Sequence, residues 1–268
     1  MTSLGNSAFV GTLHYQHLDP PVGGAGQDLQ QTLTNGNDTT LPINYDGVPV
    51  ELSQAGDDRI KIGNTAGATQ DIHSIAIGSN SGGNQGQYGT AVGFFAGNTN
   101  QADNAIAVGR SAGFDTQGLD SIGIGTRAGY ERQLTYATAI GFYAGESDQG
   151  DQAVAIGKDS GSTSQGQSSI AIGASAGNDN QGTNCVAIGA SAGNTNQSPD
   201  SICIGGGAGD TRCDDGCVII NGGGISLISA GINRCYINPI RSAPNPAGPG
   251  VSGSLWYDPI AKEVLYNP

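Results

Sequence analysis

The chain has 268 residues, of which 46 are glycine and only 12% are charged. Its 10 Lys and Arg are outnumbered by 23 Asp and Glu, which gives a net charge of −13. A chain this acidic, without a basic cluster, is a poor partner for the phosphates of nucleic acid or for an anionic membrane. It also lacks the run of about 18 apolar residues that a membrane-spanning helix needs. We therefore expect neither nucleic-acid binding nor membrane insertion.

Residues 1–59 contain no repeat. The segment has neither a basic start nor a long apolar run, so we expect no secretory signal peptide. Prolines 20–21 and glycines 23–24 predict a turn, and residues 27–33 predict a short helix. We interpret residues 1–59 as an attachment or connector segment.

Residues 60–221 are built from one repeat of 15 or 16 residues. Each repeat has a short apolar block that ends in glycine, and a second glycine follows four residues later. The closing glycines are Gly63, Gly78, Gly93, Gly109, Gly125, Gly141, Gly157, Gly173, Gly189 and Gly205. Such a repeat is too short for a helical hairpin, and its apolar–small–apolar alternation indicates a strand. The sequence therefore predicts an all-β fold, a parallel β-solenoid in which one repeat forms one coil.

The middle residue of the apolar block is small in nearly every coil. We expect the first and third residues (Ile, Val or Thr) to fill the interior and the middle residue to face outward. Two interpretations are open: a cramped corner within one chain, or a tight contact with another copy, which we favour because flat sheet faces are normally covered. The predicted contact residues are Ala91, Ala107, Ala139, Ala155, Ala171 and Ala187.

One column of the repeat is glutamine in nine successive coils, from Gln70 onward, and its tenth place is Cys213. A ladder of stacked amides, each bonded to the next coil, would satisfy the donors and the acceptor of every side chain. We prefer this structural ladder to ligand binding by the glutamines. Its predicted members are Gln85, Gln101, Gln117, Gln133, Gln149, Gln165, Gln181 and Gln197.

Residues 222–268 differ from the repeats. Three glycines at 222–224 are expected to interrupt the solenoid. The apolar runs 255–257 and 264–266 flank an Asp-Pro turn at 258–259, which is typical of a hairpin. A solenoid needs caps over its open strand edges, so we predict a C-terminal capping module that contains a β-hairpin.

Two sequence resemblances concern assembly. The blocks SIAIG, AVAIG and CVAIG, each followed by a small-small-Ala-Gly step, resemble the head repeats of trimeric autotransporter adhesins over about residues 60–221. This resemblance implies a left-handed parallel β-roll and a homotrimer. The tail CYINPIRSAPNPAGPGVSGSLWYDPIAKEVLYNP looks like the terminal module of fibre-like proteins of large DNA viruses, and SLGNSAFVGTLHY and DLQQTLTNGN resemble connector segments of phage and virus fibres.

The viral resemblance implies a non-enzymatic, homotrimeric fibre or spike on the surface of a virus particle. Such a protein would be assembled in the host cytoplasm and used for host attachment. Residues 1–59 would then contact other virion or capsid proteins. The alternative within the same structural class is a cell-surface adhesin head.

Aromatic pairs occur at matching places three coils apart. Phe94-Phe95 and Phe142-Tyr143 each follow a closing glycine, about 14 Å apart along the solenoid. Rings exposed to water are costly, and sugar faces stack on such rings, so these four residues are candidate receptor contacts for a host-surface glycan. The competing interpretation is that they pack against a neighbouring chain and help to close the trimer.

The alternative function is a polysaccharide-cleaving viral spike. Asp115 and Glu131 share a column in adjacent coils, so their backbones should lie about 5 Å apart, near the carboxylate separation of retaining glycosidases. The competing interpretation is two solvated carboxylates beside Arg132, and we expect no enzyme.

Other chemistry is sparse in the sequence. The pair His14 and His17 is too weak a signal for a metal site, so we expect no metal and no cofactor. Cys213 and Cys217 could close a small loop or bind a metal. We take free thiols as the default for these two residues, and a local disulfide between them stays open.

Overall fold

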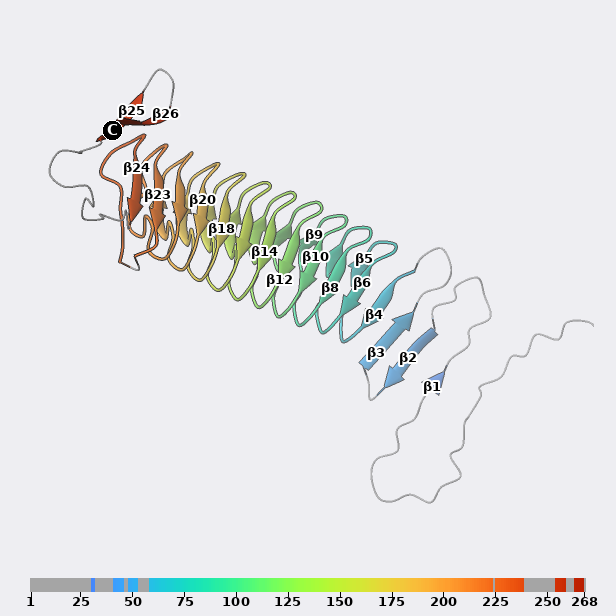
Figure 1. Ribbon diagram of the computed structural model, residues 1–268. Coiled ribbons are helices and arrows are strands. Elements are labelled where there is room, and N and C mark those ends of the chain that lie inside the picture. Colours follow the sequence, from blue (N-terminus) through green and yellow to red (C-terminus); the bar gives the residue numbers. More distant parts are fainter. Residues whose placement is uncertain are drawn as a thin grey trace, which may run out of the picture. The chain divides into compact units, whose positions relative to one another are not determined.

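The computed structural model describes residues 58–223 and 225–238, together with the backbone of five strands outside these ranges (Figure 1). The chain divides into two units, residues 1–238 and 239–268. The described part contains strands and no helix. It forms the all-β parallel solenoid that the repeat predicts, with about 11 turns of about 16 residues.

One wall of the solenoid, which we call sheet A, is made from the apolar blocks. Its strands pair in parallel and one full repeat apart, so that Ala107 lies between Ala91 and Gly123. In Figure 1 these strands follow one another in chain order. Their bounds are β4 (Ile60–Ile62), β6 (Ile75–Ile77), β8 (Thr90–Val92), β10 (Ile106–Val108), β12 (Ile122–Ile124), β14 (Thr138–Ile140), β16 (Val154–Ile156), β18 (Ile170–Ile172), β20 (Val186–Ile188), β22 (Ile202–Ile204), β23 (Val218–Asn221) and β24 (Cys235–Asn238).

The second wall, sheet B, ends each of its strands on the glutamine column. Its nine parallel strands are β5 (Thr69–Gln70), β7 (Asn84–Gln85), β9 (Asn100–Gln101), β11 (Thr116–Gln117), β13 (Glu131–Gln133), β15 (Ser147–Gln149), β17 (Thr163–Gln165), β19 (Asp179–Gln181) and β21 (Thr195–Gln197). Each glutamine pairs with its counterpart in the next coil, as Gln133 does with Gln149.

Both flanking regions differ in part from their predictions. Strand β1 (Gln30–Gln31) lies within the segment expected to be a helix, and β1, β2 (Leu41–Tyr45) and β3 (Val48–Leu52) extend sheet A in antiparallel fashion from β4. At the other end the glycines at 222–224 do not end sheet A, because β24 pairs with β23 in parallel. The predicted hairpin is present as β25 (Ser254–Asp258) paired with β26 (Glu263–Asn267).

The inward and outward faces of sheet A are the reverse of the prediction. The middle residues, among them Ala91, Ala107, Ala139, Ala155, Ala171 and Ala187, are fully buried within the single chain. They pack against a second column of buried alanines that includes Ala96, Ala112 and Ala144. The predicted contact of the middle column with another chain is therefore wrong. Because alternate strand residues face opposite sides, the Ile, Val and Thr residues point outward.

The narrow interior explains this reversal. A glutamine side chain crosses the coil from sheet B, and Gln149 Nε2 donates to the Thr138 carbonyl of sheet A at 2.9 Å. Only a small side chain fits beside that amide at the middle position. An isoleucine cannot share this space without displacing the glutamine.

Two glycine columns make the tight coils possible. Gly141 has φ +135°, and a β-carbon on it would stand 2.5 Å from the carbonyl oxygen of Gly157 in the next coil. Gly145 has φ +51°, and its β-carbon would stand 2.7 Å from Gln149 Oε1. Both backbones occupy regions that residues with a side chain rarely adopt, so the glycines set the corner of each coil.

The glutamine ladder is confirmed for seven of its eight predicted members. From Gln101 to Gln181, each Nε2 donates to Oε1 of the next glutamine at 3.0–3.2 Å. From Gln101 to Gln197, each Nε2 also donates to a sheet A carbonyl. Gln85 is the exception: its Nε2 donates to the Ile75 carbonyl, and its Oε1 has no partner. Its coil has one residue fewer between the second glycine and the glutamine, and the Gln85 amide does not reach Gln101.

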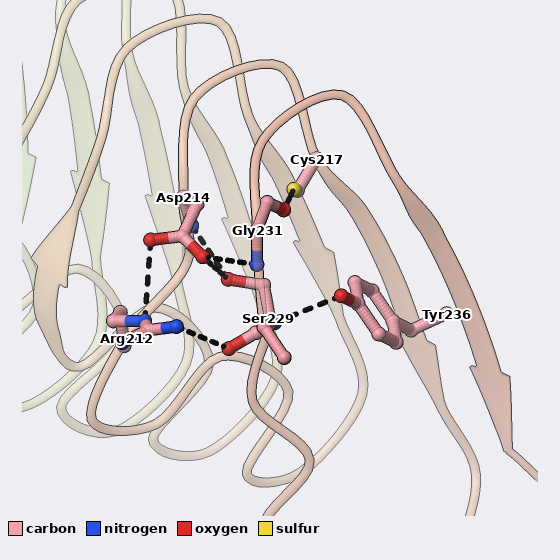
Figure 2. A network of polar contacts seen from close by, with 7 residues as sticks. Arg212, Asp214, Cys217, Ser229, Gly231 and Tyr236 are labelled. Carbon is pink, nitrogen blue, oxygen red and sulfur yellow. Dashed lines mark hydrogen bonds and ion pairs between the residues drawn. The ribbon is translucent and has the colours of Figure 1, made fainter.

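The C-terminal end of the solenoid is held by a polar network, shown in Figure 2. Asp214 accepts hydrogen bonds from the Ser229 hydroxyl at 2.8 Å and from the Gly231 amide at 2.9 Å, and it pairs with Arg212. Tyr236 accepts a bond from the Ala230 amide at 2.8 Å. The Asp214 contacts join residues 229–231 to the preceding coil, and the Tyr236 bond closes residues 230–236 on themselves. We call these contacts the C-terminal network.

Candidate interaction surfaces

The outward face of sheet A is the most extensive apolar feature among the described residues. We define the outer strip as the first and third residues of the sheet A strands from β4 to β23, all of which are Ile, Val or Thr. The first residues are half-buried. Several third residues are 36–41% exposed, namely Ile124, Ile140, Ile156, Ile188, Ile204 and Ile220. The strip thus presents branched apolar side chains to solvent on coil after coil.

The outer strip is large for an uncovered surface. Eleven strands at about 4.8 Å spacing make it about 50 Å long, and its two columns lie about 7 Å apart. The resulting outline of several hundred Å² is comparable to one side of a standard protein–protein interface, and soluble monomers rarely expose larger apolar patches. Sequence reasoning missed this surface, because it assigned the outer strip to the interior.

The four predicted receptor residues divide into two exposed and two packed rings. Phe94 is 50% exposed and Phe142 is 47% exposed, on coils three repeats apart. Phe95 and Tyr143 are half-buried, and each contacts its neighbour with ring centroids 4.2 Å apart. Of these four residues, Phe94 and Phe142 are therefore the two that are exposed enough to contact a ligand.

Phe95 and Tyr143 belong to a chain of aromatic contacts across four coils. Phe95 touches Phe114 at 5.8 Å between centroids, and Phe114 stacks on Tyr130 at 5.0 Å. The Arg127 guanidinium then lies 4.2 Å from the Tyr130 ring centre and 5.0 Å from that of Tyr143. These rings stabilise neighbouring coils against one another.

Arg127 links this aromatic chain to an acidic partner. Its Nη1 donates to the Tyr143 hydroxyl at 3.2 Å, and its Nη2 pairs with Glu146 at 3.1 Å. The hydrogen bond with Tyr143 raises the pKa of Arg127, so its charge is constant over the usual pH range. Burial raises the pKa of Glu146, and the nearby Arg127 opposes that rise.

Two exposed tyrosines accompany the exposed phenylalanines and were not singled out from the sequence. Tyr88 and Tyr136 each lie two residues before a sheet A strand, and Phe94 and Phe142 each lie two residues after the same strands. These two coils are also the ones with Thr at the first strand position. The shared pattern Tyr-x-Thr-Ala-x-Gly-Phe was the available signal. Exposed rings therefore border both ends of β8 and β14.

Asp115 and Glu131 lie in adjacent coils, as predicted, because the Asp115 amide donates to the Tyr130 carbonyl at 3.0 Å. Asp115 is half-buried and Glu131 is exposed. Neither carboxylate forms a hydrogen bond or an ion pair within residues 58–223 and 225–238. Arg132 instead pairs with Asp148 of the next coil. The arrangement offers no paired or buried carboxylate of the kind that acid–base catalysis uses.

All five cysteines are free thiols, four of them buried and Cys235 exposed. Cys217 donates to the Gly231 carbonyl at 3.0 Å, within the C-terminal network (Figure 2), and it forms no bond with Cys213. Burial is the main cause of the raised pKa of Cys185. The described residues hold no group of three or more potential metal ligands. His14 and His17 lie outside the described residues.

In comparisons with known proteins, the chain matches no family model, no curated protein and no solved structure. The described residues include no helix that is long and apolar enough to cross a membrane.

Proposed function

We propose that the chain is a non-enzymatic structural protein that assembles into a homotrimeric fibre through the outer strip. The observation that carries this proposal is the row of half-exposed Ile and Val side chains along sheet A. Covering apolar surface contributes about 25 cal/mol per Å², so a strip of several hundred Å² strongly favours association.

Further copies of the same chain are the occupants that best fit this strip. The strip repeats at the spacing between coils, and another solenoid offers the same repeat over the same length. Parallel copies around a common axis would bring equal coils together, as closed rotational symmetry requires. The proposal that three chains assemble rests on the resemblance to trimeric adhesin heads.

A place on the surface of a virus particle, with a role in host attachment, completes the proposal. It is supported by the resemblance of the tail to terminal modules of viral fibre-like proteins. Phe94 and Phe142 are the proposed receptor contacts, with a host-surface glycan as ligand, because their rings are half exposed. Residues 1–59 would join the fibre to other virion proteins, and the hairpin of β25 and β26 would cap its far end.

The assembly is tested by the molar mass in solution. Light scattering of the purified chain should give about three times 26.8 kDa. A molar mass equal to two chains would show that the assembly is a dimer and not a trimer. A monomer at micromolar concentration would overturn the proposed assembly.

A pair of variants tests the surface. Ile156→Lys places a charge on the outer strip, where an interface would leave it buried and unpaired, so the variant should be a folded monomer. Thr163→Lys introduces the same charge at an exposed position of β17 in sheet B and should leave the mass unchanged. If both variants keep the full mass, the interface is not the outer strip.

The location is tested separately. Gold-labelled antibodies should decorate the outside of intact virus particles. Label confined to the interior of the particle would contradict attachment, and label on a bacterial cell surface would favour the adhesin alternative.

A further inference from the structure

Two columns of the solenoid carry a single cysteine each, and both cysteines lie in the same coil. Cys203 occupies the middle position of β22, where most coils have alanine. Cys213 takes the place of glutamine, and its backbone pairs in parallel with that of Gln197 in the preceding coil. These two columns face each other across the interior, as Gln149 and sheet A show. The two replacements therefore meet inside one coil.

The geometry of that coil brings the two cysteine side chains into one small space. Both side chains are fully buried, and they belong to one cluster of packed core residues. A β-carbon on Gly209 would stand 2.5 Å from Cys203 Sγ and 3.0 Å from Cys213 Cβ. The Ile219 Cδ1 atom, 3.5 Å from the same point, closes the space from the next coil. The glutamine amide of other coils is thus replaced by two thiols and one methyl group.

Of the other three cysteines, Cys185 and Cys217 have other hydrogen-bond partners, and Cys235 is exposed. Cys185 and Cys217 share a different column with Ser201 between them, so they lie about 10 Å apart, beyond the reach of a disulfide. Cys185 donates to the Ser198 carbonyl at 3.0 Å, and Cys217 donates to the Gly231 carbonyl at 3.0 Å. Cys203 and Cys213 are therefore the pair whose contact favours a covalent bond.

We propose that Cys203 and Cys213 form an internal disulfide when a small peroxide oxidises the chain. This bond would cross-link sheet A to the glutamine column within the coil that contains β22. This inference concerns one chain and does not depend on the proposed assembly. A small oxidant is required because both thiols are fully buried, which excludes a bulky disulfide donor from the folded coil.

The reaction balances with hydrogen peroxide as the oxidant. The Cys213 sulfur attacks the O–O bond, which breaks to give a sulfenic acid and hydroxide, and the released thiol proton converts the hydroxide into water. The Cys203 sulfur then attacks the sulfenic sulfur, forms the S–S bond and expels a second hydroxide. That hydroxide takes the Cys203 proton to give a second water. The two sulfurs supply the two electrons that reduce the peroxide.

The order of the two steps follows from the environment of the thiols. The hydrogen bond with Cys213, and then burial, raise the pKa of Cys203. The pKa of Cys213 is lowered instead, so its sulfur is the better first nucleophile.

Trypsin provides a direct test, because Arg212 lies between the two cysteines. Cleavage after Lys158, Arg212 and Arg234 yields peptides 159–212 and 213–234. In the full-length Cys185→Ser/Cys217→Ser variant, Cys203 is the only cysteine of the first peptide and Cys213 the only cysteine of the second. After treatment with hydrogen peroxide, denaturation and alkylation, mass spectrometry should find the two peptides joined, and reduction should separate them.

Cys203→Ala in the same background is the matched control, because alanine is the usual residue of its column. It should keep the solenoid and lose the joined peptide. In the oxidised parent, amide exchange of residues 202–221 should slow by about tenfold or more relative to the reduced form. The proposal is overturned if the two peptides stay separate after peroxide treatment, whether as thiols or as sulfinic acids. It is also overturned if the unmodified chain joins Cys213 to Cys217 instead.

Discussion

Gln149 donates from Nε2 to Oε1 of Gln165 at 3.1 Å, and this bond is one rung of the ladder that runs through the interior of the solenoid. The same nitrogen donates to the Thr138 carbonyl at 2.9 Å. One amide therefore ties sheet B of its own coil to sheet A, and also ties its coil to the next. The glutamine side chain therefore stabilises both the fold of its own coil and the stacking of that coil on the next.

Gln149→Leu should destabilise the chain by about 1–3 kcal/mol, because it leaves Gln165 Oε1 and the Thr138 carbonyl without their bonds in a buried site. Denaturant unfolding followed by circular dichroism measures this loss. Gln85→Leu is the matched control and should cost less, since Gln85 lies outside the ladder and its Oε1 has no partner. Equal costs at both positions would mean that the amide-to-amide bonds contribute little.

The periodicity of the sequence predicted the coils, their parallel stacking and the glutamine ladder, because each depends on residues that recur at a fixed spacing. It did not predict which face of sheet A is buried. An apolar–small–apolar block presents isoleucine to one side and alanine to the other, and burial of isoleucine is the ordinary expectation. The glutamine column held the missing information. If an amide such as Gln149 crosses the coil, the residue opposite must be as small as Ala139.

Because the middle residues of sheet A face the interior, Ala155 is a packing residue of the core. Ala155→Leu should destabilise the coil by about 1–3 kcal/mol, because the side chain is fully buried in a space closed by the glutamine ladder. Ala190→Leu, at an exposed corner, should change stability by less than about 0.5 kcal/mol. Thermal unfolding of both variants checks this. An Ala155→Leu protein as stable as the unmodified chain would contradict the close packing of the alanine column.

The C-terminal network should weaken in acid. The hydrogen bond from Ser229, with further contributions from Gly231 and Arg212, lowers the pKa of Asp214 below the ordinary value of 3.8. A carboxylate with a lowered pKa in the folded state contributes stability above its unfolded pKa, and that stability is lost as the pH falls through the folded pKa. Residues 229–236 should therefore detach below pH 3.8.

Hydrogen exchange at the Gly231 and Ala230 amides measures this detachment, since these amides bond to Asp214 and Tyr236 in the network. Asp214→Asn should give fast exchange already at neutral pH and remove the acid transition from this segment. The interpretation fails if the acid transition persists unchanged in the variant.

Mutation of an exposed ring should affect ligand binding, whereas mutation of a packed ring should affect stability. Phe142→Ala removes a ring that is 47% exposed, so it should leave the melting temperature nearly unchanged and weaken binding to a glycan array. Tyr143→Ala removes the hydrogen bond and the stacking with Arg127, and it leaves that guanidinium with fewer partners beside Glu146. This variant should lower stability by about 1–2 kcal/mol.

Phe94→Ala repeats the test at the equivalent place three coils away. If the two exposed rings bind one extended ligand, either single variant should weaken binding, and the double variant should weaken it more than each alone. The competing interpretation is that the rings pack against a neighbouring chain. Phe142→Ala would then lower the molar mass in light scattering, whereas a receptor contact leaves a full assembly that no longer binds. Unchanged binding together with unchanged mass would exclude both roles for Phe94 and Phe142.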